Sequence, residues 1–299
     1  MHSAQELVAN IESLAVLPAV YYCVREQLES PEVSISKVVL LMEADPALAA
    51  SVLKLVNSAF YGFSRKIESV ERAIPILGLQ QTHELVLAMS VSSVFKGIRP
   101  LSMDMKQYWQ GCMLTALAAR ELAHATCNPA SERLFVIGLL ADIGHLVMYL
   151  VIPDLAVSAQ NAADAGHEPL HTAERRIIGC DFAETGAALM NTWGLPRSFA
   201  ETIGAQITPQ LAGKRTFEAE LLHLALAISK ADRYNESSEE ALARIDPRIW
   251  ADLGLAPESF PKIRESAEMN LGSCTDLFFP GEALSMAGAA FMHLNRANP

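Results

Sequence analysis

An aspartate and a histidine lie three residues apart in an otherwise apolar segment. Asp142 and His145 belong to the run from Leu134 to Ile152, in which almost every other side chain is apolar. A carboxylate and an imidazole are costly to bury without polar partners, so the pair must meet a hydrogen-bond network, a metal ion or a ligand. Side chains three residues apart on a helix can touch. We therefore expect Asp142 to act as a buried hydrogen-bond acceptor and His145 to be a structural histidine bonded to a carboxylate or a carbonyl.

The length of this apolar run raises a second interpretation, a membrane-spanning helix. A span needs about 20 apolar residues, which the run provides. Asp142 would then lie near the bilayer centre, where an acidic residue costs about 2.5 kcal/mol or more. Flanking charges are sparse, with Arg133 on one side and Asp154 on the other. The sequence therefore favours a buried central helix over a membrane span.

Composition limits the classes of function. Of the 299 residues 51% are hydrophobic and 19% are charged, which is enough apolar material for a large core. The net charge of −11 argues against binding to nucleic acid and favours basic protein partners. The five cysteines are scattered without a C-x-x-C pair, and no basic region followed by an apolar stretch opens the chain. We expect free thiols and a cytoplasmic location.

The elements that position these residues are predicted to be helices. Apolar residues recur at helical spacing and strand-like alternation is rare, so we expect an all-α fold. Asp45 followed by Pro46 is typical of a helix N-terminus. The Gly97–Pro100 segment marks the best internal boundary. Further helices are expected at about 68–77, 79–95, 104–125, 131–152, 154–165, 168–178, 181–193 and 217–234.

Three sequence blocks resemble the HDOD family. They occur in family order at residues 53–62 with 67–78, at 138–144, and at 178–189 with 193–196, and the resemblance covers about 14–209. The family consists of bacterial signalling proteins related to the HD-type metal-dependent phosphohydrolases. The resemblance implies an N-terminal helical bundle at 1–98 and an HD/phosphodiesterase-like helical core at 99–235. A C-terminal helical extension would occupy 236–299.

The resemblance also implies where a metal site would lie. HD enzymes hold a divalent metal with one histidine, a His-Asp doublet on the next long helix and a distal aspartate, and the metal activates water. In this chain the position of the first histidine falls near Gly111, and the His-Asp doublet corresponds to Ala141-Asp142. The distal acid corresponds to Asp232, and Phe182 stands where many relatives have a further histidine. The expected histidines are therefore replaced and only two acids remain. Two carboxylates without imidazoles could hold Mg²⁺ only weakly, through water. Because the histidine ligands are replaced, we expect no metal cofactor and no catalysis.

Other motif residues have simpler interpretations. Asn57 and Ser58 are expected to hydrogen-bond local backbone, although they could also belong to a motif pocket. His223 lies about two and a half turns before Asp232, so a shared ligand role is not expected. Phe60 and Tyr61 could form an exposed patch or pack in the core.

The residues and the resemblance together predict a non-catalytic signalling module. It would act through protein–protein contacts with a kinase, a response regulator or a nucleotide-cyclase type of protein, with its input supplied by a separate partner. The sequence is also compatible with a homodimer. Two alternatives remain: a residual metal-dependent phosphohydrolase using Asp142, Asp232 and His145, and a sensor that binds a nucleotide in the former HD cavity.

Overall fold

The computed structural model describes residues 1–11, 16–58, 60–63, 65–95, 97–166 and 168–279. It is 75% helical, and no strand occurs in these ranges, which confirms the all-α prediction. Residue Ala59 of the first HDOD-like block and the last 20 residues of the predicted C-terminal extension lie outside the described ranges. The helices of the first third are α1 (Ala4–Ile11), α2 (Ala19–Glu29), α3 (Ile35–Glu43), α4 (Pro46–Val56), α5 (Val70–Leu77) and α6 (Leu79–Val94).

The rest of the described chain continues the helical pattern. Its middle contains α7 (Met105–Ala125), α8 (Ser131–Leu140), α9 (Ile143–Val151), α10 (Pro153–Gly166), α11 (Leu170–Ile177), α12 (Phe182–Thr192) and α13 (Arg197–Gly204). The remaining elements are the 3₁₀ helix η1 (Pro209–Arg215), α14 (Thr216–Arg233), α15 (Ser238–Leu242), α16 (Pro247–Leu253), the 3₁₀ helix η2 (Pro257–Ser259) and α17 (Phe260–Phe278).

Local signals fix several helix ends. The carboxylate of Asp45 accepts hydrogen bonds from the amides of Ala47 and Leu48, both at 3.0 Å, as predicted for an N-cap. Between α5 and α6 the chain turns at Gly78, whose φ of 83° lies in the region that side chains disfavour. The turn residues of the sequence therefore separate helices that share one apolar core.

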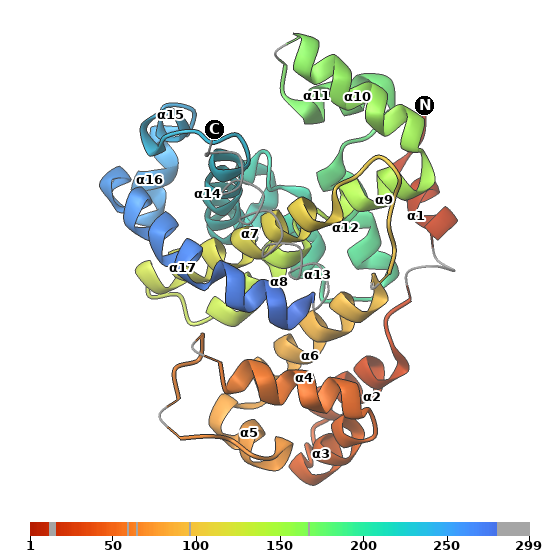
Figure 1. Ribbon diagram of the computed structural model, residues 1–299, viewed down its shortest axis with the longest axis vertical. Coiled ribbons are helices and arrows are strands. Elements are labelled where there is room, and N and C mark those ends of the chain that lie inside the picture. Colours follow the sequence, from red (N-terminus) through yellow and green to blue (C-terminus); the bar gives the residue numbers. More distant parts are fainter. Residues whose placement is uncertain (12–15, 59, 64, 96, 167, 280–299) are drawn as a thin grey trace, which may run out of the picture.

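Figure 1 shows α2 to α5 gathered at the lower end of the molecule, with α6 leading up to α7 and α8. The long helix α7 packs against α8, α14 and α17 at the centre. Helix α1 does not join the lower group; it packs against α9 and α12. One buried apolar cluster extends from Ala4 to Phe279. The division at residue 98 stays a prediction.

The apolar segment 131–151 forms two helices instead of the single predicted one. The most apolar 18-residue window of this 21-residue segment has a mean hydropathy of 2.1, and 72% of that window is buried inside the protein, as in a core helix. The helical bonding breaks at Ala141 and Asp142, where Gln206 donates a side-chain hydrogen bond of 2.9 Å to the carbonyl of Ala141. Because the side chain of Gln206 bonds this carbonyl, helix α8 can end here without leaving a buried carbonyl oxygen unsatisfied.

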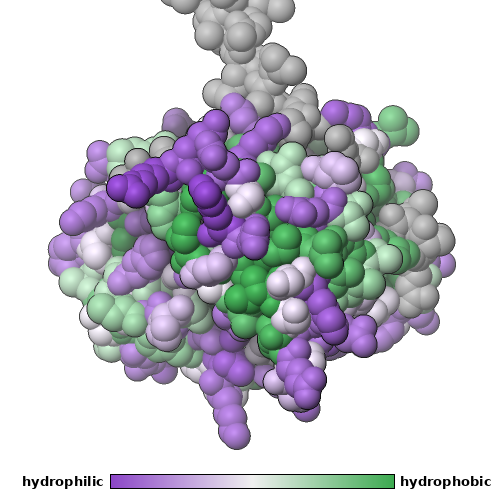
Figure 2. Space-filling view, turned by 90° about the horizontal axis from the view of Figure 1, so that it is seen from below, coloured by the Kyte–Doolittle hydropathy of each residue, from purple (hydrophilic) through white to green (hydrophobic). Residues whose placement is uncertain are grey.

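The lower helices also expose apolar side chains. Figure 2 shows this face from below, with an apolar area bordered by hydrophilic residues. Ile35 and Leu40 of α3 and Ile76 of α5 are exposed by 41%, 67% and 52%. Single exposed apolar side chains are normal on globular proteins, so their exposure alone indicates no binding site.

Candidate functional site

The predicted Asp142–His145 pair forms at the junction of α8 and α9. Asp142 is the N-cap residue of α9, and His145 lies in the first turn of that helix. His145 Nδ1 lies 2.6 Å from Asp142 Oδ1, and the two side chains are 12% and 16% exposed. The sequence therefore predicted this contact correctly. It placed both residues inside one helix, whereas the structure places them at the start of a new one.

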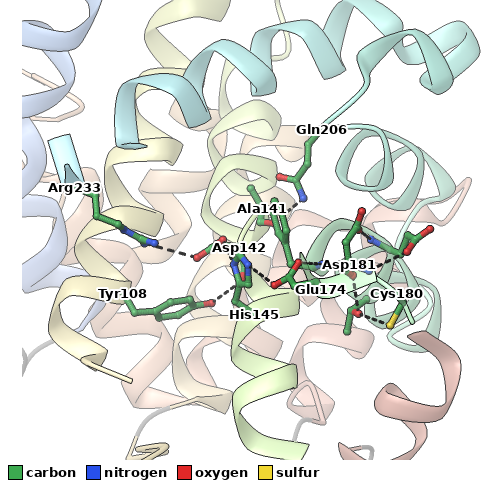
Figure 3. Close-up of polar contacts among 12 residues, drawn as sticks. Tyr108, Ala141, Asp142, His145, Glu174, Cys180, Asp181, Gln206 and Arg233 are labelled. Carbon is green, nitrogen blue, oxygen red and sulfur yellow. Dashed lines mark hydrogen bonds and ion pairs between the residues drawn. The ribbon is translucent and has the colours of Figure 1, made fainter. Parts of the chain in front are cut away.

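A second carboxylate, from a different helix, contacts the other ring nitrogen. Glu174 of α11 places Oε1 2.9 Å from His145 Nε2, and its side chain is only 3% exposed. The contact is an ion pair. The second oxygen of Glu174 accepts a 3.1 Å hydrogen bond from the backbone N–H of Phe182. Glu174 thus connects α9, α11 and the start of α12 (Figure 3).

Close packing of α9 against α12 holds the imidazole in place. The rings of His145 and Phe182 stack with centroids 4.2 Å apart and an angle of 12° between their planes. A Cβ atom at Gly144 would lie 1.9 Å from the carbonyl oxygen of Phe182. Only glycine therefore permits this approach of the two helices, which gives the glycine of the 138–144 block a packing role.

An arginine occupies the side of Asp142 that faces α7 and α14. Arg233 Nη2 lies 3.9 Å from Asp142 Oδ2, and Figure 3 shows the guanidinium reaching toward the carboxylate. A Cβ atom at Gly111 would lie 3.0 Å from the same Nη2. Arg233 therefore uses the space that the missing side chain at Gly111 leaves beside the acid.

These contacts set the charge state of the network. Burial opposes protonation of His145, but Asp142 and Glu174 outweigh it and raise its pKa to about 10. Burial likewise opposes ionisation of Asp142, yet His145, Arg233 and Lys230 hold its pKa below the usual value. At neutral pH the pair is an imidazolium and a carboxylate. A protonated imidazole has no lone pair for a metal or for a substrate proton.

The residues present do not fit the metal site of HD enzymes. Gly111, Ala141 and Phe182 provide no ligand atoms in their side chains, and the imidazole that does lie beside Asp142 is protonated. Among the residues that the structure describes, no group of three or more His, Cys, Asp or Glu side chains is arranged to hold a metal ion. What the arrangement of these described residues can do is neutralise and orient buried charges.

Asp232 does not join Asp142, although sequence position suggested that the two acids would form a remnant site. The residue is exposed, while the next residue, Arg233, contacts Asp142. Successive residues on a helix point about 100° apart. A shift of one position on α14 therefore replaces an expected second carboxylate with a cation.

The remaining predicted residues have local roles. Asn57 donates to the carbonyls of Leu53 and Ile67 and accepts from the N–H of Ile67, and Ser58 donates to the carbonyl of Leu55. His223 contacts the backbone carbonyl of Gln206 at 2.9 Å, while the side chain of Gln206 bonds the carbonyl of Ala141.

The aromatic pair of the first block packs inside the protein. The hydroxyl of Tyr61 donates to Glu132 at 2.9 Å, and the guanidinium of Arg120 lies 3.9 Å from the Phe60 ring centroid. Arg120 also pairs with Glu132 at 2.9 Å. These contacts favour the core-packing interpretation of the pair over an exposed patch.

Sequence reasoning missed Glu174 and Arg233. Glu174 lies in a helix with two adjacent arginines, where an acidic residue looks like an ordinary surface charge. Arg233 lies in the last turn of α14, where a basic residue is explained by the helix dipole. The only available signal was the unbalanced charge of a buried Asp142, which requires cations but does not say which ones.

Comparison with known proteins identifies the family and the fold. A model of the HDOD domain matches residues 14–209. An uncharacterized protein of Treponema pallidum is 27% identical over 201 residues, which is 67% of this chain and 39% of that protein. Protein YuxH of Bacillus subtilis, also uncharacterized, is 27% identical over 128 residues, or 42% of this chain and 30% of that protein. The chain thus spans less than half the length of these relatives.

Solved structures share the fold over nearly the whole chain. An HDOD protein of unknown function from Geobacter sulfurreducens has a TM-score of 0.72 at 21% identity, covering 92% of this chain and 98% of that one. A Shewanella amazonensis protein whose name proposes a phosphohydrolase has a TM-score of 0.71 at 24% identity, with coverages of 94% and 99%. A Marinobacter aquaeolei protein whose name proposes signal transduction has a TM-score of 0.65 at 22% identity, with coverages of 89% and 60%. Since the HDOD model covers well over half of the residues, this chain belongs to the HDOD family.

Proposed function

We propose that this protein is a non-catalytic regulatory module of bacterial signal transduction that works in the cytoplasm through contacts with other signalling proteins. The observation that carries the proposal is the pair of protein cations around Asp142. His145 is charged, and Arg233 lies beside the carboxylate. A divalent cation at this acid would meet repulsion from both groups. These contacts support a structural role for the network rather than a hydrolytic one.

Two further observations support a signalling role. The chain belongs to the HDOD family, and the name given to the Marinobacter relative proposes signal transduction. The expected partners are a kinase, a response regulator or a nucleotide-cyclase type of protein. The net charge of −11 favours a partner with a basic surface, because complementary charge accelerates association.

Hydrolysis is tested first, because it separates the proposal from a residual phosphohydrolase. The protein is supplied with Mn²⁺, Zn²⁺ or Mg²⁺ and assayed on bis-p-nitrophenyl phosphate and on a cyclic dinucleotide. We expect equal background rates for the wild type, for Asp142→Asn and for the surface control Asp232→Asn. Metal-dependent hydrolysis that Asp142→Asn abolishes and Asp232→Asn retains would overturn the proposal in favour of the enzyme.

Partner binding is tested separately. Affinity capture from the native bacterium is followed by rebinding of each recovered protein, in purified form, to the purified chain. A kinase, response regulator or cyclase that rebinds supports the proposal, and recovery of no such protein contradicts it. A nucleotide panel in a thermal-shift assay tests the sensor alternative, because a ligand that binds only the native state raises Tm. A rise that Asp142→Asn removes would favour the sensor.

A further inference from the structure

Helix α1 packs on a part of the core that is distant from it in the sequence. It lies against α9 and α12, while the next helix, α2, packs against α3 and α6 (Figure 1). The HDOD model begins at residue 14, so α1 lies outside the matched part of the chain. We call the surface of α9 and α12 that α1 covers the α1-docking face. It is a face of the HDOD module that a segment from outside the module covers.

The side of α1 that packs on the core has the pattern of an amphipathic helix. Its buried apolar side chains occur at positions i, i+3, i+4 and i+7, and each is at most 6% exposed: Ala4, Leu7, Val8 and Ile11. Residues at this spacing form one stripe along a helix. Proteins commonly recognise a peptide by docking such a stripe on an apolar surface. The α1-docking face is therefore a surface of the kind that binds amphipathic helices.

The polar groups at the start of α1 provide little that is specific to this segment. Ser3 and Glu6 exchange two hydrogen bonds with each other, at 2.9 and 3.3 Å. The backbone N–H of His2 donates to the carbonyl of Ile178 at 2.6 Å. A Cβ atom at Gly179 would lie 2.8 Å from the carbonyl oxygen of His2, so the glycine leaves room for the backbone of the docked segment. The core thus binds α1 by an apolar stripe and main-chain atoms, which other helices also possess.

The length of α1 limits how well it competes for this face. Its 8 residues span about 12 Å at 1.5 Å per residue, whereas α9 and α12 have 9 and 11 residues. Isolated helices shorter than about 12–15 residues are marginal in water, so α1 depends on docking for its helical form. A longer helix with the same stripe needs less stabilisation from the face. A second copy of the chain would bring only the same short helix, against an α1 tethered at an effective concentration on the order of millimolar.

We propose that the α1-docking face binds an amphipathic helix of a signalling partner, which displaces α1. The partner helix is longer than α1 and has apolar side chains at i, i+3, i+4 and i+7. The inference rests on the proposed function, since it names the surface through which a partner would act. The face is built on α9 and α12, whose packing includes the stacked rings of His145 and Phe182. A partner that docks there would therefore contact the two helices that the charge network joins.

The first test uses the full chain and a fluorescein-labelled peptide of residues 1–11 in a fluorescence anisotropy titration. Leu7 is 0% exposed, so Leu7→Asp should release α1 from the face. We expect this variant to bind the peptide at least about tenfold more tightly than the wild type, in which tethered α1 competes. Ala9→Asp is the matched control, because it adds the same charge on the exposed side of α1, and it should bind as weakly as the wild type. A peptide that itself carries Leu7→Asp should bind neither chain.

Hydrogen exchange of the wild type gives a result even if Leu7→Asp does not fold. The amides of α1 should exchange at least about a hundredfold faster than those of α7, because a displaceable helix opens locally and the central helix only with the whole fold. Sedimentation distinguishes a partner from a second copy. A wild-type dimer that Leu7→Asp dissociates would assign the face to α1 of a second copy.

The proposal is overturned by that dimer, by equal peptide binding to Leu7→Asp and the wild type, or by α1 amides as protected as those of α7. A kinase, response regulator or cyclase recovered by affinity capture should also bind Leu7→Asp more tightly than the wild type. A partner that binds both chains equally would contradict this docking face and leave the proposed signalling function standing. Failure to recover any such partner would contradict the signalling function, whereas the peptide titration would still report on the face.

Discussion

Replacing His145 by glutamine removes the cation that lies between two buried carboxylates. The pKa of His145 rises from about 6.5 in the unfolded chain to about 10 in the folded protein. Each pKa unit corresponds to about 1.36 kcal/mol, so the charge contributes at most about 5 kcal/mol to stability. Measured losses for one partner of a buried pair are about 3–5 kcal/mol. We therefore expect His145→Gln to lower the free energy of unfolding by about 3–5 kcal/mol at pH 6.

The dependence on pH identifies the cause of this loss. A histidine with a raised folded-state pKa contributes its full stabilisation below the unfolded pKa and loses it as pH rises through the folded value. The difference between wild type and His145→Gln should therefore be largest near pH 6 and should shrink toward pH 10. Denaturant unfolding at intervals of one pH unit measures this difference directly.

His223 provides the matched control. Burial lowers the pKa of His223, although its ring contacts the carbonyl of Gln206. Its stabilisation is therefore present above the unfolded pKa and is lost as pH falls, the opposite sign to His145. His223→Gln should leave the slope between pH 7.5 and 10 unchanged. A His145→Gln variant that loses less than about 1 kcal/mol at pH 6, or whose loss does not change with pH, would refute the charged network.

Three other substitutions test the same region. Asp142→Ala should cost about 3–5 kcal/mol in denaturant unfolding, because it removes one partner of the buried ion pair, and Asp142→Asn should cost nearly as much because the groups around the acid are cations; a stability gain would contradict a structural role. Gly144→Ala should lower stability by about 1–3 kcal/mol or prevent folding, since its Cβ would meet a backbone oxygen at 1.9 Å; an unchanged Tm would show that α9 and α12 are not so close. Gly111→His with Ala141→His should gain no stoichiometric Zn²⁺ by elemental analysis while Arg233 fills that space, and metal bound by the double variant would show that the guanidinium does not block the site.

The sequence by itself determined the features that depend on near neighbours in the chain. Apolar residues at helical spacing predicted the all-α fold, and the Asp45 N-cap formed as expected because a cap depends only on the next two or three residues. The Asp142–His145 contact also spans three residues. The sequence blocks were enough to identify the HDOD family, which the match over 14–209 confirms.

Only the tertiary structure decided which groups surround Asp142. Glu174 comes from α11 and Arg233 from α14, and no periodicity within either helix says which turn will face α9. The difference between Asp232 and Arg233 is a rotation of about 100° around one helix axis. That rotation is set by packing against α7, where a glycine at position 111 leaves room for the guanidinium. If Asp232 faced Asp142, the two acids would form a remnant metal site; because Arg233 faces it instead, the acid joins a charge network. Packing between helices that are distant in sequence decides which of the two residues faces the acid.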